Sequence, residues 1–95
     1  MRLDKFLQVS RLIRRRTLAN QLCDGGHVQR DGRALRASAE VHPGDQLDVD
    51  YGWRKLRVEV LEVPPGPVPK MVAASLYRLI HEERVAPEPP DDREG

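Results

Sequence analysis

The chain has 95 residues, of which 39% are hydrophobic and 33% charged, and its formal net charge is +1. This length allows one domain with a modest core and leaves no room for a second. No apolar run approaches the length of a membrane span, so we expect a cytoplasmic protein without a membrane partner. The single cysteine, Cys23, excludes an internal disulfide, and the three histidines lack metal-ligand spacing. We therefore expect neither a metal nor a cofactor.

The charge is distributed unevenly along the chain. Residues 1–36 contain nine Lys or Arg and three Asp, which gives this part a net charge of +6. Residues 37–95 contain seven Lys or Arg and twelve Asp or Glu, which gives a net charge of −5. Such an asymmetry favours a polyanionic partner for the first part of the chain.

Two short helices are predicted at the start of the chain. Leu3, Phe6 and Leu7 recur at helical spacing, which predicts a helix over residues 3–9. A tight connection over residues 10–14 leads to a second helix from about Arg15, which ends at Gly25-Gly26 because glycine favours helix termination. Helices of this length are not stable alone, so they must pack on another part of the chain.

Alternating and turn-forming residues predict a sheet after these helices. Asp31-Gly32 is a strong hairpin signal between short strands at residues 27–30 and 33–35. Apolar and charged residues then alternate over 47–51 and 56–60, which indicates two further half-buried strands. The order of helices followed by strands predicts an α+β domain over residues 1–62, with the helices packed on a small twisted sheet.

The remainder is predicted to contain a linker, a helix and a tail. Residues 63–69 include four prolines and are expected to form a stiff linker. An apolar stripe at helical spacing then predicts a C-terminal helix over residues 70–85. Residues 86–95 are rich in proline and acidic side chains, so we expect a disordered acidic tail.

The predicted inter-helix corner carries a dense basic cluster. Arg11 and Arg14 to Arg16 lie within six residues, and Arg2 and Lys5 are on the preceding helix. A guanidinium group suits phosphate because it donates two parallel hydrogen bonds and is weakly hydrated. Cations at the start of a helix are disfavoured by the helix dipole, and a bound anion would relieve this cost. The cluster therefore favours an RNA partner over a merely solvated face.

Other functions fit the sequence less well. A sheet that stacks bases needs several aromatic residues on one face, and Tyr51 and Trp53 are interpreted as core and rim residues, so recognition of phosphate and RNA shape is preferred. Neither a catalytic Ser/His/Asp spacing nor a glycine-rich phosphate loop is present, and Cys23 is expected to be buried, so we expect no enzyme. A protein-interaction module that docks through the C-terminal helix remains an alternative.

Specific motifs resemble the S4-type RNA-binding domain. They are Arg2-Leu3-Asp4-Lys5-Phe6-Leu7, Ser10-Arg11, Ala19, Leu22, Gly26-His27-Val28, Asp31-Gly32 and Pro43-Gly44-Asp45. The match covers roughly residues 1–50 with the spacing of the whole unit preserved. The resemblance implies the S4-like, or alpha-L, fold and an RNA surface formed by the two helices and the loop between them.

Within that domain family, the chain looks like the stand-alone RqcP-like factors of ribosome-associated quality control. This implies a non-enzymatic factor, a monomer when free, that binds the large ribosomal subunit carrying an obstructed peptidyl-tRNA. There it would support alanine tailing of the stalled nascent chain by a factor of the NEMF/RqcH type. A heat-shock-type protein that recycles stalled large subunits is the alternative, weakened by the acidic tail. The residues expected to contact ribosomal RNA and tRNA are Arg2, Lys5, Arg11, Arg14, Arg15, Arg16 and Arg36.

Overall fold

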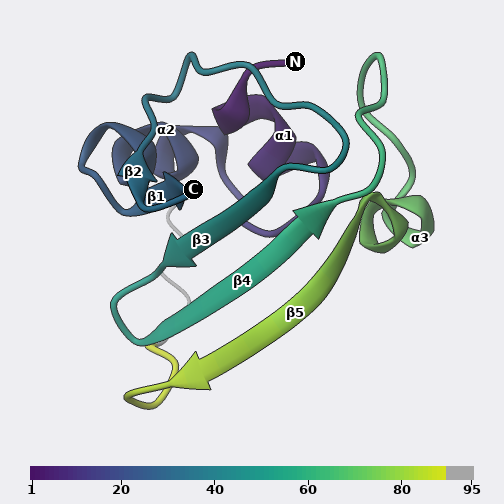
Figure 1. The fold of residues 1–95 in the computed structure, drawn as a ribbon. Coiled ribbons are helices and arrows are strands. Elements are labelled where there is room, and N and C mark those ends of the chain that lie inside the picture. The colour runs from purple at the N-terminus through teal and green to yellow at the C-terminus, as the bar shows by residue number, and fades with distance from the viewer. Residues whose placement is uncertain (90–95) are drawn as a thin grey trace.

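A computed structural model describes residues 1–89, which form two N-terminal helices on one face of an antiparallel sheet (Figure 1). The helices are α1 (Leu3–Val9), α2 (Arg16–Asp24) and α3 (Lys70–Ala73), and a 3-10 turn, η1 (Ala74–Leu76), follows α3. The strands are β1 (Val28–Arg30), β2 (Arg33–Ala34), β3 (Gln46–Asp50), β4 (Arg54–Val60) and β5 (Tyr77–Arg84). The predicted α+β class and S4-like fold are confirmed.

Helices α1 and α2 form where the apolar spacing predicts them. Leu3, Phe6 and Leu7 are fully buried. After α1, Arg11 adopts a φ of 64°, the left-handed conformation that reverses the chain at many helix ends but is uncommon for arginine. This reversal returns Leu12 and Ile13 to the core, where they are 6% and 2% exposed.

The five strands are ordered β2-β1-β3-β4-β5, and every neighbouring pair is antiparallel. The predicted hairpin joins β1 to β2 through Asp31 and Gly32, whose φ angles of 55° and 79° are those that a tight hairpin turn requires. Val28, Val49 and Leu56 lie opposite one another across three strands and face the same side of the sheet. These residues and their neighbours form one core with the apolar faces of α1 and α2.

The predicted C-terminal helix over residues 70–85 is wrong for most of its length. Only Lys70–Ala73 is α-helical, and residues 77–84 form β5, which pairs with β4 from Tyr77 opposite Val60 to Arg84 opposite Arg54. Because β5 belongs to the same sheet, the boundary expected at residue 62 is also wrong, and the folded unit extends to Arg84.

The prediction of a helix over residues 70–85 failed because the apolar residues at helical spacing lie in different environments. Leu76, the last residue of η1, is buried, whereas Met71 is 87% exposed and Leu79 is 48% exposed. The open edge of β4 offers unpaired backbone groups, and pairing with them satisfies the backbone of residues 77–84. Cross-strand charges add to this preference, since Arg78 lies 2.7 Å from Glu59 and Arg54 lies 3.3 Å from Glu82. Tertiary pairing thus overrides local periodicity.

The segment expected to be a linker has no regular structure between residues 61 and 69, yet Val63 and Val68 pack against the core. Of the predicted acidic tail, residues 86–89 are exposed and irregular, and residues 90–95 lie outside the described part of the chain. Within residues 1–89, the helices are all too short to cross a membrane.

Candidate RNA-binding surface

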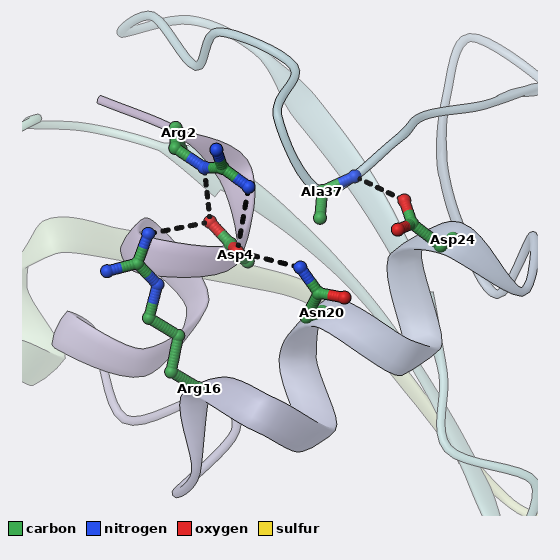
Figure 2. Close-up of polar contacts among 6 residues, drawn as sticks. All are labelled: Arg2, Asp4, Arg16, Asn20, Asp24 and Ala37. Atoms are coloured by element: carbon green, nitrogen blue, oxygen red, sulfur yellow. Dashed lines mark hydrogen bonds and ion pairs between the residues drawn. The ribbon is translucent and has the colours of Figure 1, made fainter.

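The buried carboxylate of Asp4 joins the two N-terminal helices (Figure 2). It lies in the first turn of α1, where the helix dipole favours a negative charge. Arg2 donates from Nε to Oδ1 at 3.1 Å and from Nη2 to Oδ2 at 3.3 Å. From α2, Arg16 Nη2 lies 3.5 Å from Oδ1, and Asn20 Nδ2 donates to Oδ2 at 3.2 Å. One carboxylate thereby fixes two of the predicted RNA-contacting arginines.

Asp4 is ionised in this environment. Burial by itself raises the pKa of Asp4, but the hydrogen bonds from Arg2 and Asn20 and the positive charge of Arg16 together outweigh it, so the pKa lies below its ordinary value. The side chains of Arg2 and Arg16 remain 49% and 48% exposed, so each guanidinium group binds Asp4 and still reaches solvent.

The loop between β2 and β3 is fastened to both helices and carries Arg36. The backbone N–H of Ala37 donates to Oδ1 of Asp24 at the end of α2, at 2.9 Å, as Figure 2 shows. In the other direction, the Asp4 N–H donates to the Ala37 carbonyl at 3.2 Å, and the Leu3 N–H donates to the Ala39 carbonyl at 2.8 Å. These bonds hold the exposed Arg36 on a segment anchored to the same two helices.

The connection between α1 and α2 presents the rest of the basic cluster. Arg11, Arg14 and Arg15 are exposed, while Ser10 is buried and donates from Oγ to the Leu7 carbonyl at 3.2 Å. Arg15 is the N-cap residue of α2, and among the described residues no side chain caps this terminus. The first turn of α2 also lacks an acidic residue, so its positive end faces an arginine-rich surface.

The structure therefore arranges six of the seven predicted residues in three groups. Arg2 and Arg16 meet at Asp4, three arginines lie on the inter-helix connection, and Arg36 is on the fastened loop. Lys5 is half-buried on α1. Together they define what we call the basic corner: Arg2, Lys5, Arg11, Arg14, Arg15, Arg16 and Arg36.

Sequence reasoning assigned no role to Asn20 and Asp24, which hold this surface together. The sequence also gives no sign that Asp4, besides its neighbour Arg2, contacts Arg16 and Asn20 on α2. Neither Asn20 nor Asp24 belongs to a charge run or motif that marks it from sequence. Their roles arise from packing between residues that are 16 and 13 positions apart in the sequence.

Cys23 and two acidic residues of β3, Asp48 and Asp50, lie in structural environments. Cys23 is buried, and this desolvation, with the nearby charges of Asp4 and Asp24, raises the pKa of its thiol to about 12. A thiol with this pKa is a poor nucleophile at neutral pH. Asp48 pairs with Arg57 at 2.8 Å, and Asp50 accepts a hydrogen bond from the Gly52 N–H. In the part of the chain that the structure describes, no group of His, Cys, Asp or Glu could hold a metal ion.

Comparison with known proteins identifies the domain and the family. The S4 domain family matches residues 1–47. The chain is 45% identical to the RQC P-site tRNA stabilizing factor of Bacillus subtilis, a match that covers 90% of this chain and 98% of that protein. It is 42% identical to the factor of the same name from Halalkalibacterium halodurans, over 90% of this chain and 97% of that protein.

A solved structure supports the same fold. Heat shock protein 15 of Vibrio cholerae, described as trimeric, superposes with a TM-score of 0.77 at 28% identity, over 84% of this chain and 81% of that one. The sequence matches span nearly the entire length of the factors from both species above. The chain therefore contains an N-terminal S4 domain and belongs to the family of RQC P-site tRNA stabilizing factors.

Proposed function

We propose that this protein is a non-enzymatic RNA-binding factor of ribosome-associated quality control. It binds the large ribosomal subunit that carries an obstructed peptidyl-tRNA and stabilises the P-site tRNA while alanines are added to the stalled chain. A tailing factor of the NEMF/RqcH type acts on the same particle. The similarity to named P-site tRNA stabilizing factors over 98% and 97% of their lengths supports this assignment.

The observation that carries the proposal is the basic corner assembled around Asp4. Its buried carboxylate holds Arg2 and Arg16 in fixed positions, so that less side-chain entropy is lost when each guanidinium group binds a phosphate. The seven basic residues of the corner come from α1, from Arg2 just before it, from α2 and from two connecting segments. A folded RNA presents phosphates from more than one strand, and a corner of this shape suits it better than a linear basic run.

The N-terminus of α2 is also expected to attract an RNA phosphate. Arg15 and Arg16 stand where the helix dipole disfavours a cation, and no acidic side chain occupies the first turn. A phosphate would be attracted both by the two arginines and by the free N–H groups of the helix. We therefore assign Arg15 and Arg16 to direct contact with RNA backbone.

Co-sedimentation with large subunits that carry peptidyl-tRNA tests the proposal. The double variant Arg15→Ala/Arg16→Ala should lose binding by at least about tenfold, because a hydrogen bond to a charged group contributes about 1.5–3 kcal/mol. A matched control is Arg57→Ala/Arg78→Ala, which removes two exposed arginines from the sheet. The control should bind like the parent.

Arg16 also contacts Asp4, so stability must be separated from binding. Arg15→Ala alone leaves the hydrogen bonds of Asp4 intact and should still weaken subunit binding, and urea unfolding of this variant measures its stability separately. Equal loss of binding in the control double variant, or parental binding by Arg15→Ala/Arg16→Ala, would place the RNA surface elsewhere.

The heat-shock-type alternative is less well supported. The fold is shared with heat shock protein 15, but identity to that solved structure is 28%, against 45% for the Bacillus subtilis factor. An assay of alanine tailing separates the two functions. We expect tailing of stalled chains to fall when the protein is removed and to be restored by the parent.

A further inference from the structure

We propose a second RNA contact next to the basic corner, in which an unpaired base stacks on the Arg84 guanidinium group where it lies over Trp53. This inference rests on the proposed function, because the RNA is the one bound at the basic corner. It adds base stacking, a different chemistry, to the phosphate recognition assigned above.

Tyr51, Trp53, Arg54 and Arg84 form a layered cluster at one end of the sheet. The rings of Tyr51 and Trp53 have centroids 6.0 Å apart. The guanidinium carbon of Arg54 lies 4.7 Å from the Tyr51 centroid and 5.0 Å from the Trp53 centroid. That of Arg84 lies 5.3 Å from the Trp53 centroid. We call these four residues the stacked cluster.

The strand register places the stacked cluster on the helix side of the sheet. Arg54 lies two residues before Leu56, which is buried in the core beneath the helices, so both side chains point to the same face. Arg84 pairs directly with Arg54 across β4 and β5, and opposed residues share a face. The face that carries α1 and α2 therefore continues onto Arg84.

A direct contact links the stacked cluster to the inter-helix connection, which carries three residues of the basic corner. The hydroxyl of Tyr51 donates a hydrogen bond of 2.6 Å to the carbonyl of Leu12, which lies between Arg11 and Arg14 on the inter-helix connection. An RNA strand bound through those arginines would thus pass close to the stacked cluster. Trp53 and Arg84 come from distant parts of the sequence, so only the fold reveals that they share a cluster with Tyr51, which contacts this connection.

Arg84 is ordered and yet accessible. Glu82 lies 3.6 Å from Arg84 Nε and 3.3 Å from Arg54 Nη1, and the N–H groups of Val85 and Ala86 both donate to the Trp53 carbonyl. The Arg84 side chain nevertheless remains 55% exposed. A planar guanidinium group held over an aromatic ring is a stacking surface for a nucleobase, and single-stranded RNA is commonly bound in this way.

Trp53 is the single tryptophan of the chain, so its fluorescence reports on this site alone. The probes are a short RNA hairpin with an unpaired loop and a fully paired RNA of the same length. We expect both RNAs to bind the parent protein and only the looped hairpin to quench Trp53. Arg84→Gln should weaken binding of the looped hairpin by about tenfold, the range of one lost base stack, and leave duplex binding within about twofold.

Two further variants distinguish stacking from charge. Arg84→Lys keeps the positive charge but replaces the planar guanidinium group by an ammonium group. This variant should lose the preference for the looped hairpin and keep duplex binding. Arg57→Gln is the matched control, because Arg57 is 54% exposed and ion-paired like Arg84 but lies on the opposite face. It should retain the preference.

A loss of affinity that is equal for looped and duplex RNA in Arg84→Gln would overturn the stacking proposal. Unchanged Trp53 fluorescence on binding of the looped hairpin would do the same while leaving the proposed function intact. Failure of the parent to bind either RNA or the large subunit would overturn both.

Discussion

At the scale of single residues, Asp4 decides the geometry of the basic corner. A buried carboxylate is costly unless it is paired and hydrogen-bonded, and Asp4 meets this requirement through Arg2, Arg16 and Asn20. The same contacts bring arginines from two elements to one place. Stability and RNA recognition are therefore coupled at this carboxylate.

Asp4→Asn should destabilise the protein by about 1–3 kcal/mol, because the charged acceptor of hydrogen bonds from Arg2 and from α2 becomes neutral. Urea unfolding measures this change. Asp31→Asn is the control, since asparagine adopts the positive φ of that exposed turn as readily as aspartate. An equal effect of the two substitutions would show that the Asp4 contacts contribute nothing particular to stability.

Acid should remove the contribution of Asp4 to stability. The pKa of Asp4 in the folded state lies below its ordinary value of 3.8, so the contribution is present above that pH and is lost as the pH falls through the folded-state pKa. The difference in unfolding free energy between the parent and Asp4→Asn should accordingly shrink below about pH 4. A difference that stays constant down to pH 2 would contradict the ionised state of Asp4.

The sequence predicts the basic residues of the corner but not how they are held. Arg11 and Arg14 to Arg16 stand out by density alone, and their exposure on the inter-helix connection or at the start of α2 agrees with that expectation. The contributions of Asn20 and Asp24 depend on how α2 packs against α1 and against the loop before β3. Such contacts leave no periodic signal. Direct contact of any of these residues with RNA stays a prediction.

At the scale of elements, β5 shows where local patterns fail. Both helices, the hairpin and the two long central strands follow spacing or turn chemistry that acts over a few residues. Residues 77–84 instead pair with residues of β4 that lie 17 to 30 positions earlier in the sequence, from 77 − 60 = 17 to 84 − 54 = 30. The spacing of apolar residues carries no information about an open strand edge, because such an edge exists only in the assembled sheet.

Alanine substitutions distinguish the strand from the predicted helix. On one helical face, Leu76 and Leu79 would be buried alike. In the structure Leu76 is 1% exposed and Leu79 is 48% exposed, so Leu76→Ala should cost about 2–4 kcal/mol and Leu79→Ala less than about 1 kcal/mol. Urea unfolding of both variants checks this order, and equal losses would favour the helix.

At the scale of the whole molecule, the excess of positive charge lies in the first part of the chain. Along β4 and β5, Arg54, Arg57 and Arg78 each lie within 3.3 Å of a carboxylate oxygen. The first 36 residues, in contrast, carry a net charge of +6. The excess of positive charge therefore lies in the part of the chain that carries the basic corner, and we expect it to attract a polyanion to this part.

The salt dependence of binding to large subunits tests this account most directly. Neutralising about five phosphates predicts a slope of about −4 to −5 for the logarithm of affinity against the logarithm of salt concentration. Arg15→Ala/Arg16→Ala should reduce the steepness by about 2, one for each lost phosphate contact. Arg57→Ala/Arg78→Ala should keep the parental slope. Binding of the parent that is insensitive to salt, or identical slopes for all three proteins, would contradict recognition of RNA through the basic corner.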